Sequence, residues 1–585
     1  MSSPANKKKV IITSALPYVN NVLHLGNIIG SVLSADVFAR YAKARWPHDD
    51  IIFVGGVDEY GTATEMKARE AGVSCKELCD KNGLSHEEIN RWFMIGFDCY
   101  GRTSQPNGNP AQVEADWPQT KITHTIFNNL CKAKYVIEKE ETCMYCPEID
   151  SFVADRFVTG TCPNCKYPKC NGDQCDDCGK LLAPEEIIDP KYKPNPEFKL
   201  EVRTTKNLYI DTNKIWQDNE MTQWFKSREG TWTNTASSIT EDWLNRGLKP
   251  RSITRDLKWG TVVPNTPEFG DMYRNKVFYV WFDAPIGYIS ITEKQLGQDE
   301  SERYWRDPKT KLIQFMAKDN VQFHSVIFPV TLRGSGYSEI SEVDIVSTEY
   351  LMYEGQKFSK TNNIGLFGDD VINISKKYNL CPDYWRAYLI FIRPENNDSN
   401  FVLNAEGGFV DFVNNILIKN IGNLLHRVLS LAFQIHNKHK VDTIEVNGLS
   451  HESKSLDDDC KDICDEYQTH MDKYRLSEGF KTTLKFSTRL NLYINETEPW
   501  NLIKDGRRKD ELYGCMVNLY LKVIELSHIL EPFMPRFSKD MGDKFKITQI
   551  GSKRAGSDLI QLRTVLTIPL EKPSIVINQL DKIDM

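Results

Sequence analysis

Two stretches near the start of the chain, KVIITSALPYVNNVLHLGN (residues 9–27) and DDIIFVGGVDEYGT (residues 49–62), decide the fold. Each begins as a short, continuous apolar run and passes into a loop that contains Gly, Asn or Pro. Apolar residues from Ile28 to about Arg45 recur at helical spacing, and residues 62–71 form a second helical stretch. Continuous apolar strands that alternate with helices predict an α/β fold with a parallel, doubly wound sheet.

Doubly wound sheets bind their ligands outside the carboxyl ends of the strands. The loops at residues 19–27 and 57–62 follow two such strands, so both are candidate binding loops. Strand and helix signals return at residues 276–290, 311–329 and 344–355. After about residue 400 the strand signals fade, and long helical patterns predict an α-helical bundle.

The composition of the 585 residues excludes several classes of protein. Lys and Arg number 73 against 80 Asp and Glu, a net charge of −7, so any contact with nucleic acid is expected to be local. No uninterrupted apolar stretch approaches the ~20 residues that span a bilayer, so we expect no membrane partner. The N-terminal sequence MSSPANKKKV has no apolar segment of a secretory signal, and we expect a cytoplasmic protein.

Two short motifs offer groups that bind phosphate. His24-Leu25-Gly26-Asn27 lies between the first strand and the first helix, where free N–H groups and the helix dipole favour anions. Lys357-Phe358-Ser359-Lys360-Thr361 lies between Gly355 and Gly365 and offers two lysines that can clamp a polyphosphate. A turn-capping histidine and ordinary surface lysines are the alternative explanation of either motif alone.

Together the two motifs resemble the "HIGH" and "KMSKS" signatures of class I aminoacyl-tRNA synthetases. SALPYVNNVLHLGN, GGVDEYGTATE, VFYVWFDAPIGY, KDNVQFHS, GQKFSKT and NETEPW, in this order over roughly residues 8–545, are similar to the methionyl-tRNA synthetase family. The resemblance implies that L-methionine and ATP, with Mg²⁺, give methionyl adenylate and pyrophosphate. It further implies that methionine is then transferred to tRNA(Met).

The resemblance also implies a division of the chain into segments. A Rossmann-like catalytic domain is expected in two halves, 1–119 and 276–345, around a connective insertion at 120–275 with a zinc knuckle at about 140–185. Residues 346–405 are expected to form a stem-contact region with the KFSKT loop, 406–545 an α-helical anticodon-binding domain, and 546–585 a C-terminal tail. No appended dimerisation domain is recognisable, so we expect a monomer.

The residues at the predicted binding edge suit an amino acid with a thioether. Asp58 follows the second strand, and its carboxylate can hold an ammonium group, although a solvated loop acid is the alternative. Trp281, Ala284, Pro285, Tyr288, Phe323 and His324 can form an aromatic pocket that suits polarizable sulfur, or belong to an ordinary core. By the resemblance, the methionine site is lined by Leu16, Tyr18, Asp58, Trp281, Ala284, Pro285, Tyr288, Val321 and His324.

The same resemblance assigns the ATP site. Its members are His24, Asn27, Asp319, Lys357 and Lys360, with Gly26 and Ser359 in the same two motifs. His24, Asn27, Lys357 and Lys360 are the expected catalytic residues. Some relatives have a second histidine where this chain has Asn27, so this donor cannot become cationic.

Seven of the 15 cysteines fall between Cys143 and Cys178. The pattern C-x2-C-x9-C-x2-C at Cys162, Cys165, Cys175 and Cys178 has the number and spacing of ligands for one closed, structural Zn²⁺ site. We expect Cys143 and Cys146 to be free thiols, with a half-filled second site as the alternative. Cys170 is expected to be a spare thiol.

The helical region contains a candidate RNA-binding face. Asn423 and Arg427 are four residues apart on one helix face, and Trp500 follows Glu498-Pro499. Such a set can stack on and hydrogen-bond splayed bases, although a core tryptophan and a solvated arginine are the simpler explanation. The resemblance implies that these three residues read the anticodon. Two alternatives stay open: a class I synthetase for cysteine or a branched aliphatic amino acid, and a non-enzymatic RNA-binding protein with this fold.

Overall fold

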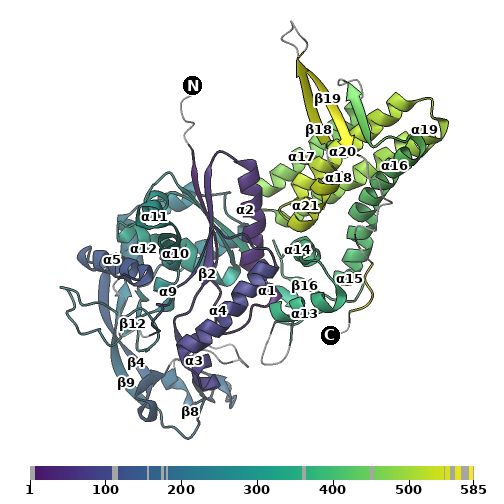
Figure 1. Cartoon of the computed structure of the whole chain (residues 1–585). Coiled ribbons are helices and arrows are strands. Elements are labelled where there is room, and N and C mark those ends of the chain that lie inside the picture. Colours follow the sequence, from purple (N-terminus) through teal and green to yellow (C-terminus); the bar gives the residue numbers. More distant parts are fainter. Residues whose placement is uncertain are drawn as a thin grey trace. The chain divides into compact units, whose positions relative to one another are not determined.

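The computed structural model describes residues 7–108, 116–153, 157–172, 175, 177–178, 182, 184–358, 364–447, 453–545, 547–553, 560–567, 577 and 579–583. The chain divides into two compact units, each built from separate stretches of sequence (Figure 1). Unit 1 comprises residues 1–22, 48–88 and 97–347, and unit 2 comprises residues 23–47, 89–96 and 348–585. None of the helices in these described ranges is long and apolar enough to cross a membrane.

Unit 1 is built on a five-stranded sheet of order β14-β13-β1-β2-β3. Its strands are β1 (Lys9–Ser14), β2 (Asp50–Val57), β3 (Cys99–Arg102), β13 (Lys311–Ala317) and β14 (Glu342–Thr348). β1 pairs in parallel with both β2 and β13, and β2 pairs in parallel with β3. The predicted parallel α/β sheet is therefore confirmed. The strand order reverses on either side of β1, which makes the carboxyl end of β1 the expected place for a ligand.

Helices cover this sheet where glycines allow a close approach. α10 (Gly287–Leu296) packs against β2 and β3, beside α5 (Pro118–Lys132) and α11 (Gln298–Trp305) (Figure 1). Gly56 and Gly101 are paired in adjacent strands. A Cβ at Gly56 would lie 2.3 Å from the Gly101 carbonyl oxygen and 2.6 Å from Ile291 Cδ1 of α10. Only glycine fits at this contact, and so the helix lies close to the strands.

The helices α3 (Thr62–Ala71) and α4 (Cys75–Trp92) follow β2 in the sequence. α3 has the bounds that the sequence predicted. After β13 come the single turn η5 (Lys318–Asn320), η6 (Phe323–Ile327) and α12 (Phe328–Gly334), and before α10 lies α9 (Val280–Asp283). These short elements position the residues of the candidate site.

The described part of the insertion within unit 1 has two antiparallel sheets of three or four strands and a separate two-stranded one. One has the order β10-β9-β4-β5 and is dominated by the long pair β4 (Val136–Cys146) and β9 (Glu201–Ile210), with β5 (Ser151–Val153) and β10 (Arg251–Ser252) at its edges. The other joins β6 (Val158–Thr161), β7 (Cys170–Asn171) and β8 (Ile188–Tyr192). The remaining elements are α6 (Thr212–Asp218), α7 (Met221–Ser227), α8 (Asn234–Asn245), β11 (Thr254–Arg255) and β12 (Val277–Phe278). This region is more regular than its sequence pattern indicates, because β9, half of whose side chains are exposed, is fixed by pairing with a distant strand.

Unit 2 begins with one continuous helical run made of α1 (Leu25–Asn27), the π-helical η1 (Ile28–Val32) and α2 (Leu33–Arg45). The helix starts before the predicted Ile28 because His24 caps it: the Asn27 backbone N–H donates to His24 Nδ1, and the His24 backbone N–H donates to Asn27 Oδ1. π-Helical turns occur frequently at functional sites.

The rest of unit 2 is mostly helical, as predicted. Its helices are α13 (Gly368–Tyr378), α14 (Pro382–Phe391), α15 (Phe409–Asp411), η7 (Phe412–Gly422), α16 (Asn423–His439), α17 (Lys454–Asp472), α18 (Leu476–Thr497), α19 (Pro499–Asp505), α20 (Lys509–Leu530) and α21 (Pro535–Lys544). Two short strands, β15 (Leu351–Tyr353) and β16 (Ser399–Phe401), pair in parallel. A three-stranded sheet of β17 (Thr443–Asn447), β19 (Ile560–Thr567) and β18 (Ile547–Lys553) joins the tail to the helical region.

Candidate active site

The loops after β1 and β2 are joined at the predicted binding edge of unit 1. Tyr18 and Asp58 form an isolated parallel bridge. The Asp58 N–H donates to the Pro17 carbonyl at 3.0 Å, and the Val19 N–H donates to the Asp58 carbonyl at 3.2 Å. The structure therefore brings together two residues that the sequence assigned to the site from different loops.

The Asp58 carboxyl group is buried, and no described residue forms an ion pair with it. Asp58 is 3% exposed, and its Oδ1 has no hydrogen-bond partner within the described part of the chain. Burial, followed by the nearby negative charge of Asp283, raises the pKa of Asp58 well above its ordinary value. A buried acceptor without a partner is costly, so this oxygen is suited to receive a donor from a bound ligand.

Aromatic rings from three segments stack next to this carboxyl group in unit 1. Trp281 of α9 and Phe323 of η6 are parallel, with centroids 3.6 Å apart. The edge of the Tyr18 ring meets Trp281 with a centroid distance of 6.0 Å and an interplanar angle of 88°. Leu16 packs against the hydrophobic core of unit 1, in which Tyr288 and Val321 are fully buried. Ala284 and Pro285 are also buried and end α9.

His324, next to these aromatic residues, is neutral and accepts a hydrogen bond from Tyr288. Its Nδ1 lies 2.9 Å from the Asn320 carbonyl oxygen, and its Nε2 lies 2.9 Å from the Tyr288 hydroxyl. A carbonyl only accepts, so Nδ1 carries the hydrogen and Nε2 accepts from Tyr288. Burial lowers the pKa of His324 to about 4. The Tyr288–His324 pair is therefore neutral at physiological pH. Asp319, the expected ATP residue, is exposed on η5, just after β13.

In unit 2, His24 has a fixed tautomer. Nδ1 accepts from the Asn27 backbone N–H at 3.2 Å, and burial lowers the pKa of His24 to about 4. A neutral imidazole whose Nδ1 accepts has its hydrogen on Nε2, so Nε2 is a donor. The ring stacks on Phe358 with centroids 4.6 Å apart. A Cβ at Gly26 would lie 2.9 Å from His24 Nδ1, so glycine leaves room for the ring.

The second motif is described up to Phe358. Lys357 is exposed, with Nζ 5.9 Å from the centroid of the Tyr350 ring. Gly365 has φ +119°, and a Cβ there would lie 2.3 Å from Phe358, so this position requires glycine. Phe358 thus joins the two predicted motifs within unit 2. Ser359 and Lys360 lie outside the described residues.

Four of the cysteines form a compact cluster. The Sγ atoms of Cys162, Cys165, Cys175 and Cys178 all lie within 4.8 Å of one another. The Sγ atoms of Cys162 and Cys178 are 3.9 Å apart, and those of Cys165 and Cys175 are 3.6 Å apart. Four thiolates at about 2.3 Å from a tetrahedral ion are about 3.8 Å apart, so the four sulfur atoms fit such an ion.

The remaining cysteines of the insertion have other surroundings. Cys146 lies with its Sγ 3.5 Å from Glu148 Oε2, and Cys170 is buried in the hydrophobic cluster around the four sulfur atoms.

The three expected anticodon residues lie in the helical part of unit 2. Asn423 is exposed on α16, and Trp500 is half-buried on α19. Arg427 donates from Nη1 to Asn491 Oδ1 at 3.1 Å and from Nη2 to Asn495 Oδ1 at 2.6 Å. The two asparagines of α18 therefore fix the orientation of the Arg427 guanidinium.

Sequence reasoning missed several charged residues that support the site. Glu59 is fully buried and accepts hydrogen bonds from Arg102 Nε at 2.7 Å and from the Ser104 hydroxyl. Asp283 is 1% exposed: Oδ2 accepts from Thr261 at 2.8 Å, while Oδ1 has no partner within the described residues. A carboxylate inside the apolar run VFYVWFDAPIGY was the available signal for Asp283.

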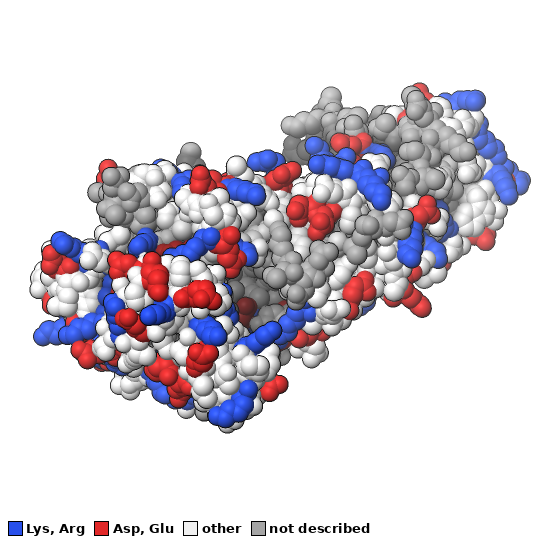
Figure 2. Space-filling view, turned by 90° about the horizontal axis from the view of Figure 1, so that it is seen from below, with Lys and Arg blue, Asp and Glu red and all other residues white. Residues whose placement is uncertain are grey.

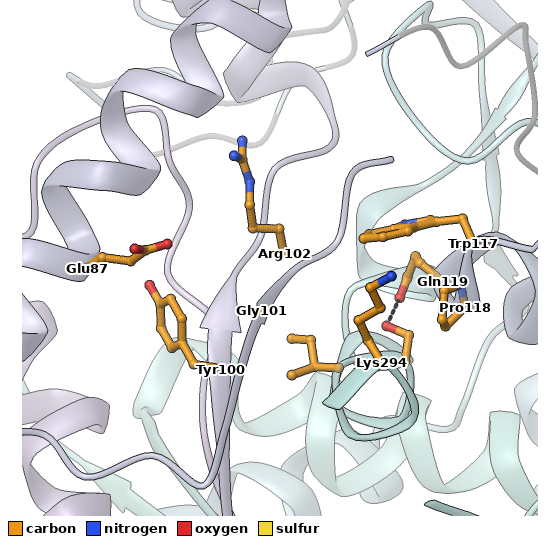
Figure 3. A pocket seen from close by; sticks show the side chains of 10 residues that line it. Glu87, Tyr100, Gly101, Arg102, Trp117, Pro118, Gln119 and Lys294 are labelled. Atoms are coloured by element: carbon orange, nitrogen blue, oxygen red, sulfur yellow. Dashed lines mark hydrogen bonds between the residues drawn. The ribbon is translucent and has the colours of Figure 1, made fainter. Parts of the chain in front are cut away.

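A cavity of about 240 Å³ in unit 1 is lined in part by Arg102, the partner of Glu59 (Figure 3). Arg102 and Tyr100 border it on one side, and Trp117, Gln119 and Lys294 on the other. Gln119 accepts from Ser290 at 2.6 Å and donates to the Asp283 carbonyl at 2.7 Å. The walls of the cavity therefore belong to the scaffold of the candidate site, and none of the predicted site residues lines the cavity.

Comparison with known proteins gives consistent matches. Residues 10–429 match the family described as tRNA synthetases class I (M). The chain is 40% identical over 558 residues to a probable cytoplasmic methionine–tRNA ligase of Dictyostelium discoideum, covering 94% of this chain and 71% of that protein. It is 40% identical over 548 residues to the cytoplasmic methionine–tRNA ligase of Homo sapiens, covering 91% of this chain and 56% of that protein. The chain thus spans only part of the length of these relatives.

Among solved structures, the chain is similar to Mycobacterium tuberculosis methionyl-tRNA synthetase in complex with methionyl-adenylate. The TM-score is 0.71 at 19% sequence identity, and the match covers 97% of this chain and 99% of that one. This likeness supports the fold.

Proposed function

Because this chain belongs to the methionyl-tRNA synthetase family of class I, we propose that it joins L-methionine to tRNA(Met). A carboxylate oxygen of methionine attacks the α-phosphorus of ATP·Mg²⁺, and the bond to the leaving pyrophosphate breaks, which gives methionyl adenylate. A terminal ribose hydroxyl of the tRNA then takes the methionyl group and releases AMP. Family membership disfavours a synthetase for cysteine or a branched aliphatic amino acid.

The observation that carries this proposal is the unpartnered Oδ1 of Asp58 beside an aromatic stack. The ammonium of methionine is the donor that this buried oxygen lacks, and its positive charge offsets the buried carboxylate. Trp281 and Phe323 offer aromatic surface to the thioether. The Tyr288–His324 pair is neutral, so placing an apolar thioether next to it removes no charge from water.

The triphosphate is assigned to the two motifs. His24 Nε2–H donates to a phosphoryl oxygen, and Asn27 is exposed at the start of the same helix. Lys357 and Lys360 stabilise the charge that develops on pyrophosphate, and Asp319 and Ser359 complete the ATP-binding set. Since His24 is neutral, the positive charge comes from the two lysines and Mg²⁺.

The other ligands follow from the residues present. The four-cysteine cluster is proposed to hold one structural Zn²⁺, closed to chemistry because all four positions are protein sulfur. Asn423, Arg427 and Trp500 are proposed to read the anticodon, as part of a helical domain at 406–545. A cytoplasmic location accords with the names of the relatives. The monomeric state stays a prediction that light scattering tests.

The test is methionine-dependent pyrophosphate exchange, measured for each of the twenty amino acids with metal analysis of the same sample. We expect exchange with methionine alone and about one zinc per chain. Exchange that depends on another amino acid, or none at all, contradicts the proposal.

Replacing Trp500 by Ala tests the anticodon assignment. Loss of base stacking worth ~1–3 kcal/mol should reduce kcat/KM for tRNA charging by about 5–150-fold. Pyrophosphate exchange should stay unchanged. Leu492→Ala, at an exposed position of the neighbouring helix α18, is the control. A parallel loss of both activities in Trp500→Ala would remove Trp500 from the anticodon site.

A further inference from the structure

One face of α4 holds the backbone of both binding loops in unit 1. Cys79, Asn82 and His86 are three and four residues apart and so lie on one side of the helix. His86 Nε2 lies 2.7 Å from the Asn21 carbonyl oxygen, and Asn82 Nδ2 donates to the Val19 carbonyl. Cys79 Sγ lies 3.6 Å from the Glu59 carbonyl oxygen. The three side chains are buried.

The protonation of His86 fits this role. Burial lowers the pKa of His86 to about 4, so the ring is neutral at physiological pH. A carbonyl oxygen only accepts, so Nε2 carries the hydrogen and Nδ1 carries none. Nδ1 has no partner within the described part of the chain. An unpaired buried nitrogen destabilises the fold relative to an apolar side chain, which is difficult to explain if His86 serves stability alone.

The two carbonyls belong to residues of the first loop that are two positions apart and have different neighbours. Val19 follows Tyr18 directly, and its N–H donates to the Asp58 carbonyl at 3.2 Å. Asn21 comes three residues before His24. Asn82 therefore holds the loop residue that is hydrogen-bonded to the backbone of Asp58, whereas His86 holds a residue nearer to the HLGN motif.

We propose that Asn82 and His86 are positioning residues with separate roles, Asn82 for methionine binding and His86 for the reaction of ATP. The inference rests on the proposed function, because that function assigns Asp58 to methionine and the HLGN motif to ATP. Neither side chain is proposed to touch a substrate. Each acts through one hydrogen bond to the loop backbone.

The experiment measures two quantities in each variant: the Kd of methionine by equilibrium dialysis without ATP, and kcat of pyrophosphate exchange. His86→Ala should lower kcat by about 10–100-fold, as expected for a small displacement of reacting groups, with the Kd within about twofold of the parent. Asn82→Ala should raise the Kd at least about fivefold. His86→Gln, which retains an N–H donor, should recover most of kcat. Leu84→Ala, at a position of α4 that is 66% exposed, should change neither.

The outcomes separate the inference from the proposed function. A wild-type protein without methionine-dependent exchange would overturn the proposed function. An active wild-type protein with normal kcat in His86→Ala would overturn the inference alone, as would equal losses of both quantities in both variants. If His86→Ala does not fold, His86→Met and His86→Gln decide: the inference requires that Gln keep kcat and that Met lose it.

Discussion

At the scale of single residues, burial determines the protonation of several groups at the candidate site. From the sequence, Asp58, Trp281 and His324 could be proposed as site residues because they lie in motifs at the ends of predicted strands. Glu59 and Arg102 could not, because an ion pair between residues 43 positions apart leaves no local pattern. Residue type alone could not reveal that His24 is a neutral donor, since burial and the Asn27 N–H determine this.

Asp283 gives a pH-dependent prediction at this scale. Burial raises the pKa of Asp283 to about 7, from an ordinary value near 3.8. Between these values the folded protein binds more protons than the unfolded chain, so the free energy of unfolding falls as pH rises. Each pH unit in this range lowers it by about 1.4 kcal/mol. Asp283→Asn removes the effect, since the amide oxygen can still accept from Thr261.

We therefore expect that, between pH 5 and pH 8, the free energy of unfolding of Asp283→Asn rises by about 2–3 kcal/mol relative to that of the wild type. Urea unfolding of both proteins at the two pH values measures this gain. Asp271→Asn is the control, because Asp271 is well exposed. A stability difference that is the same at both pH values would contradict the assignment of the raised pKa to Asp283.

At the scale of elements, helices with strong periodicity were predictable and strands fixed by distant partners were not. α3 has the predicted bounds because its periodic pattern is local. Half of the β9 side chains are exposed, so its sequence shows no long apolar run, and the strand is ordered by ten residue pairs with β4. The π-helical turns of η1 were also unpredictable, because an extra residue in a helical turn barely changes the apolar spacing.

The four-cysteine cluster gives the prediction for an element. Cys162, Cys165 and Cys175 belong to or pack against a small core that includes Val158 and Ile187, so metal binding and local folding are expected to be coupled. Cys165→Ser should reduce the zinc content from about one per chain toward zero and make residues 158–192 sensitive to protease. The Kd of methionine should not change, because no cluster residue belongs to the proposed methionine site.

Cys170→Ala is the matched control, since Cys170 is buried in the same core but is not one of the four clustered sulfur atoms. Elemental analysis and limited proteolysis of the two variants measure the effects. If Cys170→Ala lost the metal and Cys165→Ser kept it, the ligand set would be wrong.

At the scale of the whole molecule, sequence order alone associates residues 23–47 with the strands on either side of them. The structure instead assigns these residues to the unit that contains residues 348–585. The reason lies in partners that are distant in sequence: Tyr41 donates to Asp472 at 2.6 Å, and Arg386 pairs with Asp36 at 2.7 Å.

Figure 2 shows acidic and basic side chains interleaved over one face, in accord with a net charge of −7.

The Arg386 contact gives the prediction at this scale. Arg386 is fully buried and donates to Asp36 and to the carbonyls of Phe93, Pro532 and Phe533, so it joins distant segments within unit 2. Removing one partner of a buried ion pair leaves the other group without compensation, which costs about 3–5 kcal/mol. We expect Arg386→Met and Asp36→Asn each to lower the free energy of unfolding of unit 2 by about this amount.

The double variant distinguishes an ion pair from two independent packing defects. Once either partner is gone, removing the other no longer breaks the pair, so the double variant should be at least about 1 kcal/mol more stable than the sum of the single losses predicts. The coupling should be incomplete, because Arg40 also pairs with Asp36 and continues to compensate its charge in Arg386→Met. Chemical denaturation of the four proteins of this cycle measures it. Strict additivity would mean that Arg386 stabilises unit 2 through its three carbonyl contacts and that its charge has no part in joining the segments.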